Sequence, residues 1–87
     1  EDMFKCFRKF CKDNGVVYTL YPANRFMEFY QMAIQYKMKF MSLRFVYDKK
    51  KKFALRFIVK MKIGLMKDIN ILKPVYIDAG DVIFDED

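Results

Sequence analysis

The sequence predicts one small α/β domain with the order helix, parallel strand, helix and antiparallel β-hairpin, as in the second half of an open sheet. Three observations predict this fold class. Two segments carry apolar residues at the helical period, a short β-branched and aromatic run separates them, and the apolar period changes to two after Phe40. With 87 residues, the chain has room for a single core.

The first helix is expected from Asp2 to Asn14, with Gly15 as its C-terminal cap. Its apolar face has the i, i+3, i+4, i+7 spacing and comprises Met3, Phe4, Phe7, Phe10 and Cys11. The following run, "VVYTLY" from Val16 to Tyr21, is almost continuously apolar, which is typical of a strand covered on both faces. We therefore expect this run to be the central strand.

A second helix is expected after Pro22, which ends the strand, with Asn24 as the N-terminal cap. Its predicted apolar face consists of Phe26, Met27, Tyr30, Ala33, Ile34 and Met38. A helix of this length can cross back over the sheet, so the strand, the helix and the next strand should form a right-handed βαβ unit.

The hairpin is predicted from two alternating segments, "MSLRFVYD" at Met41 to Asp48 and "FALRFIVKMKI" at Phe53 to Ile63. Pairing Tyr47 with Phe53 would place Arg44 opposite Arg56. Directly opposed like charges cost stability unless a counter-charge is present. An acidic residue of this protein and a bound phosphate are the two alternatives.

The cations favour polyanionic partners, because 17 Lys and Arg outnumber 11 Asp and Glu and give a formal charge of +6. The lysine run Lys49, Lys50, Lys51 and Lys52 has two interpretations, a solvated turn that discourages edge-to-edge aggregation or a set of phosphate contacts. The aromatic residues among the cations are either core residues or platforms for unpaired bases.

Several classes of active site are excluded or unsupported by composition. The chain has no histidine and one serine, Ser42, so a hydrolase triad is excluded. Gly15, Gly64 and Gly80 are too far apart for a phosphate loop, and the chain has no Cys-x-x-Cys pair. Cys6 and Cys11 are expected to be buried, reduced thiols. The C-terminal carboxylates lack metal-ligand spacing, and residues 79–87 are interpreted as an acidic, flexible tail.

The sequence also gives expectations about context. No apolar run reaches the roughly 20 residues that cross a bilayer, so we expect a cytoplasmic protein without a membrane partner. The composition is 54% hydrophobic, more than a domain of this size easily hides, and the first helical pattern begins immediately after Glu1. We therefore expect residues 1–87 to be one partial domain of a longer polypeptide, able to self-associate in isolation.

Three segments of the chain resemble a known family. They are "KDNGVVYTLYPANRF" (Lys12 to Phe26), "LRFVYDKKKKFALRFIV" (Leu43 to Val59) and "ILKPVYID" (Ile71 to Asp78). In this order and spacing they resemble the C-terminal part of the class I methyltransferases of the tRNA adenine-N6 group, which use S-adenosylmethionine (SAM) to methylate an adenine beside the anticodon of a valine tRNA. The sequence departs from the family at Lys60, where a glutamate is usual, and at Lys73, where a proline is usual.

The resemblance implies the C-terminal half of a Rossmann-like class I methyltransferase sheet. In that fold "VVYTLY" pairs with the last hairpin strand on one side and with a strand of the missing N-terminal half on the other. The SAM-binding and catalytic motifs of the family lie in that missing half. The implied protein is therefore a SAM-dependent enzyme when complete, whereas this chain alone is expected to bind no cofactor and to be inactive.

The resemblance further implies RNA, in particular tRNA, as a partner, and the cations of this half as phosphate contacts. The candidate contact residues are Arg25, Arg44, Lys49, Lys50, Lys51, Lys52, Arg56, Lys60 and Lys62. Two further hypotheses remain: a stand-alone basic α+β module that binds RNA without chemistry, and a piece that docks on a partner chain supplying the other half of the sheet.

Overall fold

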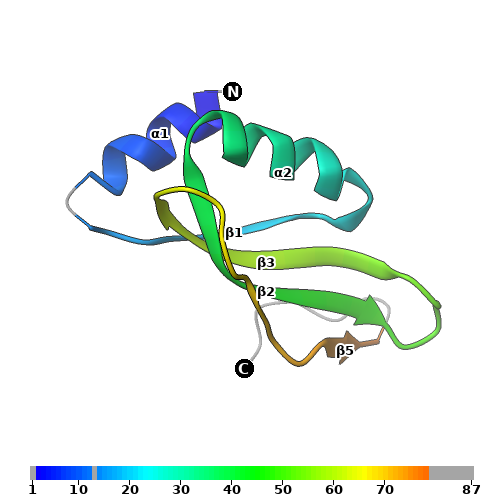
Figure 1. Cartoon of the computed structure of the whole chain (residues 1–87). Coiled ribbons are helices and arrows are strands. Elements are labelled where there is room, and N and C mark those ends of the chain that lie inside the picture. Colours follow the sequence, from blue (N-terminus) through cyan, green and yellow to red (C-terminus); the bar gives the residue numbers. More distant parts are fainter. Residues whose placement is uncertain (1, 13, 79–87) are drawn as a thin grey trace.

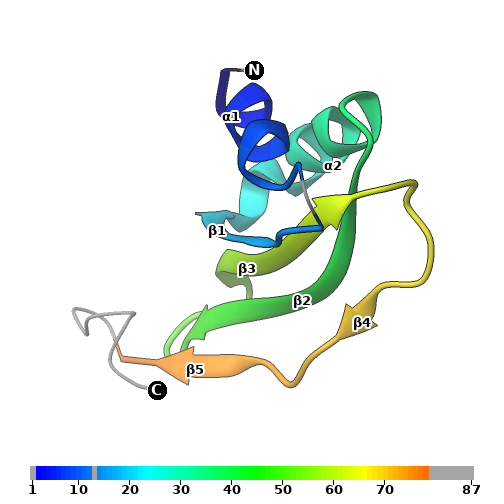
Figure 2. The ribbon, with the colours of Figure 1, turned by 90° about the vertical axis from the view of Figure 1, so that its left-hand side faces the viewer.

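The computed structural model of the chain describes residues 2–12 and 14–78. They form a small mixed α/β domain in which both helices lie over one face of a twisted sheet (Figures 1 and 2). The elements in chain order are α1 (Asp2–Phe10), β1 (Val17–Pro22), the 3-10 helix η1 (Ala23–Arg25), α2 (Phe26–Gln35), β2 (Met38–Asp48), β3 (Ala54–Ile63), β4 (Asn70–Ile71) and β5 (Val75–Ile77).

The sheet has the strand order β1-β3-β2-β4, and β5 also pairs with β2. Strand β3 is antiparallel to both β1 and β2, so β1 and β2 run in the same direction on either side of it. Strands β4 and β5 are parallel to β2 (Figure 2). The sheet is therefore mixed, as the predicted parallel strand and antiparallel hairpin require.

The prediction that Val16 to Tyr21 forms the central strand is wrong. Within residues 2–12 and 14–78, β1 pairs only with β3 and lies at the edge of the sheet. Its apolar run reflects two different environments, because Tyr21 packs against Phe29 of α2 whereas Tyr18 is 64% exposed on the opposite face. Continuous apolarity did not mean burial on both faces.

The core lies between the helices and one face of β1, β2 and β3. Its fully buried aromatic residues are Phe4, Phe29, Phe40 and Phe57. Phe29 lies at the centre of this cluster, with ring centroids 5.0 Å from Phe4 and 5.4 Å from Phe57. These rings join α1, α2 and β3, and aromatic pairs at such distances add to the stabilisation from buried area.

Both helices are shorter than predicted. The first ends at Phe10, which is 80% exposed rather than part of the apolar face, and Asn14 has the positive φ of 65° expected at Gly15. In α2, Met27 and Ile34 are exposed while Phe29 and Ala33 are buried, so the apolar face is rotated from the predicted one. The 3-10 turn at Ala23–Arg25 precedes this helix, and Arg25, not Asn24, occupies its N-cap position.

The hairpin was predicted correctly as two antiparallel strands, but its register was wrong by two residues. Arg44 pairs with Ile58 and Arg56 with Val46, so the two arginines do not face each other. The reason is that the turn extends through Phe53 and the pairing shifts again between Val46 and Tyr47. A shift of two residues preserves the face of every side chain.

A second irregularity lies between Phe40 and Ser42, where Met41 is an extra residue in β2. Because of this bulge, Met38 and Phe40 point into the core before it, and Leu43 and Phe45 do so after it. Strand β2 therefore changes from even to odd core positions at Met41.

The remaining predictions concern the cysteines, the membrane and the tail. Cys11 is buried as predicted, whereas Cys6 is exposed on the outer side of α1. No helix in the described part of the chain has the length and apolar character of a membrane-spanning helix. The predicted acidic tail, residues 79–87, lies outside the described residues.

Candidate nucleic-acid interface

The face of the sheet opposite the helices carries a group of cations. We call this face of the sheet the open face. Its side chains alternate with the core residues along β1, β2 and β3 and pair across the strands. The open face consists of Tyr18, Leu20, Lys39, Ser42, Arg44, Arg56, Ile58, Lys60 and Lys62. Toward the hairpin tip this face is closed, because Val46 and Asp48 are buried.

The charge of the open face has one sign. Five of its nine members are cations, and Asp48 is the only carboxylate on β1, β2 and β3. An oxygen of Asp48 accepts a hydrogen bond from the Lys50 backbone N–H at 2.9 Å, so this carboxylate serves the turn. The ion pairs between described residues are Arg25–Glu28 and Lys49–Asp78, and neither involves an open-face cation.

A like-charge pair does exist on this face, at a different place from the predicted one. Lys39 lies directly opposite Lys62 in the β2–β3 register. The Lys39 stem packs over Gly64, where an added Cβ would lie 3.1 Å from Lys39 Cδ. Opposed like charges in a sheet are destabilising without a counter-charge. The pair therefore creates a local preference for an anion.

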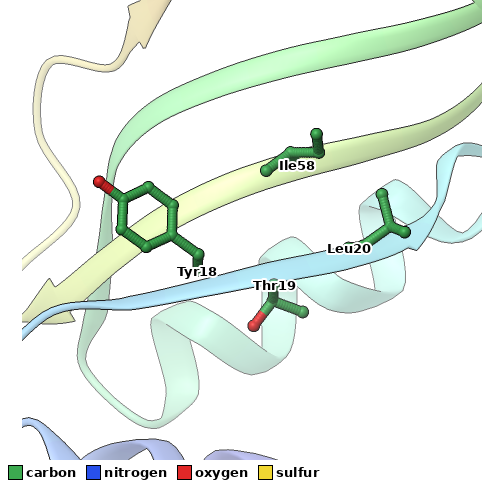
Figure 3. A pocket seen from close by; sticks show the side chains of 4 residues that line it. All are labelled: Tyr18, Thr19, Leu20 and Ile58. Carbon is green, nitrogen blue, oxygen red and sulfur yellow. The ribbon is translucent and has the colours of Figure 1, made fainter. Parts of the chain in front are cut away.

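Beside the cations lies a shallow apolar hollow of about 240 Å³, lined by Tyr18, Thr19, Leu20 and Ile58. Figure 3 shows Tyr18 and Leu20 projecting from the same side of β1, whereas Thr19 points the other way. Lys60 pairs with Tyr18 across the strands, and its Nζ lies 5.8 Å from the centroid of the Tyr18 ring. An exposed aromatic ring beside a cation is a suitable platform for an unpaired base.

Arg44 has a structural partner that neither sequence alternative included. Its guanidinium donates a 2.6 Å hydrogen bond to the backbone carbonyl of Lys73, in the segment between β4 and β5. This bond fixes that segment to β2. The guanidinium keeps its charge and its other donors, so Arg44 contributes positive potential to the open face.

The lysine run forms the turn between β2 and β3 at the hairpin tip (Figure 1). The Lys49 N–H donates to the Ile77 carbonyl at 2.7 Å, and the Lys51 N–H donates to the Asp48 carbonyl at 3.0 Å. Lys49 Nζ also lies 3.8 Å from Asp78 Oδ2. The side chains of the four lysines are exposed, so the tip is a second cationic region, partly compensated by Asp78.

Arg25 belongs to η1 and is a member of neither the open face nor the hairpin tip. Its guanidinium forms a 2.6 Å ion pair with Glu28 and lies 5.8 Å from the centroid of the Tyr21 ring. The hydrogen bond from Arg25 to Glu28 raises the pKa of the arginine above its ordinary value. Because its charge is neutralised locally, Arg25 is the weakest of the predicted contact residues.

No family can be added to this geometry from sequence similarity. The chain matches no protein-family model and no curated protein. The support for a function is therefore the one-sided charge, the exposed ring and the strand order.

The described residues do not fit SAM. The hollow is lined by three apolar or aromatic side chains and Thr19, and offers no carboxylate to hold a ribose. At Gly15 an added Cβ would lie 3.1 Å from the Phe10 carbonyl oxygen, and at Gly64 it would lie 3.1 Å from Lys39 Cδ. These two described glycines therefore allow other parts of the chain to pack closely against them and do not form a glycine-rich loop. Residues 2–12 and 14–78 also contain no cluster of three metal-ligating side chains.

The structure brings together Arg44, Arg56, Lys60 and Lys62 from the predicted contact residues and adds two that the sequence did not single out. These are Tyr18 and Lys39. Tyr18 was hidden because its strand was expected to be covered on both faces. Lys39 was missed because the second helix was expected to reach Met38 and the hairpin to begin at Met41, whereas β2 begins at Met38. The resemblance implied that this strand lies beside the last hairpin strand, and the β1–β3 register shows that Tyr18 pairs with Lys60 there.

Proposed function

We propose that this chain is the C-terminal portion of a SAM-dependent methyltransferase that acts on a nucleic-acid base, with tRNA adenine N6 as the expected target. In this proposal, the strands complete the sheet of the enzyme and the open face binds RNA phosphates. The observation that carries the RNA contact is the set of five cations without a described carboxylate partner. The β1–β3 pairing supports the enzyme assignment, because the resemblance implies that pairing.

The physical basis of the RNA contact is neutralisation of phosphates. Phosphate contacts fix the position of a nucleic acid and release counterions, which makes binding dependent on salt. The backbone holds the five cations on one surface, so their side chains are already close together before RNA arrives. A base held for methylation leaves its stack, and contacts to the neighbouring backbone would orient it.

The RNA contact is tested by fluorescence anisotropy of labelled tRNA over a series of salt concentrations. The triple variant Arg56→Gln, Lys60→Gln, Lys62→Gln should bind more weakly, and its log–log salt slope should fall by about 0.7 to 0.9 per lost phosphate contact. The matched control is Lys5→Gln, Lys9→Gln, Lys12→Gln, which removes the same charge from the exposed side of the first helix and its following turn. Equal losses in the two variants would exclude an open-face site.

The hairpin tip is tested separately. Changing Lys49, Lys50, Lys51 and Lys52 to Ala in the full-length protein should weaken RNA binding and lower its salt dependence. An unchanged salt slope would mean that the tip is only a solvated turn.

The enzyme assignment has a test of its own, the intact mass of the native polypeptide that carries this sequence in its source cell. A chain more than twice this size, able to transfer a labelled methyl group from SAM to tRNA, is the expected result. A native mass near 10.6 kDa would contradict the enzyme assignment.

A second candidate function is RNA binding without chemistry by this chain as it stands. The observation that favours it is Tyr18, which is 64% exposed beside Lys60 and can stack on an unpaired base. Salt-sensitive binding of RNA by a monodisperse 87-residue monomer would support this alternative.

A third candidate is docking on a partner chain, favoured by the outer edge of β1, which has no strand partner among the described residues. Self-association that a partner chain relieves would support docking.

A further inference from the structure

We propose that residues 79–87 of this chain bind back to the open face and compete there with RNA, which would make the open face self-inhibited. This inference rests on the function proposed for the open face. It concerns the apolar hollow that Tyr18 lines and the acidic sequence after Asp78. The two have complementary chemistry.

The sequence of this segment is "AGDVIFDED", in which three apolar residues stand between carboxylates. The open face has the converse arrangement, with the apolar Leu20 and Ile58 beside the cations Arg56 and Lys60. The segment has four acidic side chains, at Asp81, Asp85, Glu86 and Asp87, and the open face has five cations. Alternating apolar and charged contacts of this kind give both attraction and orientation.

The chain leaves the described region at a place from which the segment can reach the hollow. Ile77 pairs with Asp48 at one end of β2, and Lys49 holds Asp78 there. The hollow lies about four residues along the strands from this point, or about 13 Å, and three strands across, or about 14 Å. The diagonal is therefore about 20 Å, and the six extended residues from Asp78 to Phe84 span about 20 Å, so Phe84 is the apolar residue of the segment that reaches the hollow.

Attachment to the same chain makes weak contacts sufficient. A tethered segment has an effective concentration in the millimolar range, so a segment with a dissociation constant of a few hundred micromolar would occupy its site most of the time. RNA would then bind only to the fraction of molecules with a free face. The apparent RNA affinity would fall by that fraction, about three- to tenfold.

The decisive variant changes the apolar residues of the segment and leaves its charge unaltered. Val82→Ser, Ile83→Ser, Phe84→Ser in the full chain should raise the affinity for labelled tRNA about three- to tenfold, since it releases the face. A chain in which residues 79–87 are scrambled, with identical composition, is the control for unspecific charge.

A measurement without RNA separates this inference from the proposed function. The labelled peptide AGDVIFDED is added to the full chain that carries the three serines, and binding is followed by fluorescence anisotropy. Saturable binding that is lost in Ile58→Glu, and retained by the control Lys5→Gln, Lys9→Gln, would support docking even if tRNA fails to bind any variant. Absence of peptide binding, or unchanged tRNA affinity in the serine variant of a chain that does bind tRNA, would overturn the inference.

Discussion

The two faces of strand β3 differ in what their side chains do. Phe57, Val59 and Met61 are completely buried under the helices, whereas Arg56, Ile58 and Lys60 alternate with them on the opposite face. Neighbouring residues in sequence therefore have separate physical roles. Odd positions contribute to the free energy of unfolding, and even positions contribute charge and surface for a partner. Point substitutions on this one strand can separate stability from binding.

The largest expected effect is on the buried face. Phe57→Ala removes a ring in contact with Tyr21, Phe26, Phe29 and Phe45, and should lower the free energy of unfolding by about 3–5 kcal/mol. The control on the open face, Ile58→Ala, should cost much less because its side chain is only half-buried. Urea unfolding followed by circular dichroism measures both, and equal costs would contradict the distinction between the faces.

The next effect concerns Lys37, which lies between α2 and β2. Its φ is 55°, a left-handed conformation that costs a side chain about 1–2 kcal/mol relative to glycine. Lys37→Gly should therefore raise the free energy of unfolding by about 1 kcal/mol, measured in the same urea titration. A loss of stability would show that the lysine side chain makes a compensating contact.

A smaller effect with opposite signs on stability and binding is expected at Lys62. Lys62→Glu replaces the repulsion with Lys39 by an attractive cross-strand pair, which should stabilise the free protein by about 0.5 kcal/mol. The same change should weaken RNA binding. If the variant loses both stability and affinity, the repulsion between Lys39 and Lys62 does not destabilise the protein in the absence of an anion.

The smallest expected effect is the change of stability with pH that the Cys11 thiol causes. Burial raises the pKa of this thiol, so the unfolded chain releases the proton at a lower pH than the folded protein. Stability should therefore fall as pH rises from the ordinary cysteine pKa to the raised one. The difference in unfolding free energy between wild type and Cys11→Ala should shrink across this alkaline window. A constant difference would mean that Cys11 does not titrate differently in the folded state.

The elements of the fold could be predicted from periodicity, but their relative placement could not. The change of period after Phe40 located the hairpin, because side chains of a strand alternate whatever the register, but β2 begins at Met38, which was expected on the second helix. The register itself depended on the extra residues near the turn, which no alternation reveals. The edge position of β1 was missed because an apolar run looks the same whether helices or solvent lie beyond it.

The candidate site was predictable to the extent that it uses strand residues in phase with the hairpin. Arg56, Lys60 and Lys62 share a parity in the sequence, and the two-residue register error left that parity intact. Lys39 lies before the predicted start of the hairpin at Met41, so it was not assigned to a strand, and the bulge gives it the opposite parity to Arg44. Arg25 was proposed from its sequence position, but its pairing with Glu28 depends on how the 3-10 turn meets α2.

The extra residue Met41 determines which face of the sheet the preceding residues of β2 occupy. Every residue before it is assigned to the opposite face from the one that counting back from Leu43 would give. Deleting Met41 would not simply shorten the strand. It would move the preceding residues to the opposite faces of the sheet, so that Lys39 would turn toward the aromatic core and Phe40 toward solvent. Either the fold or the pairing with β3 would then have to change.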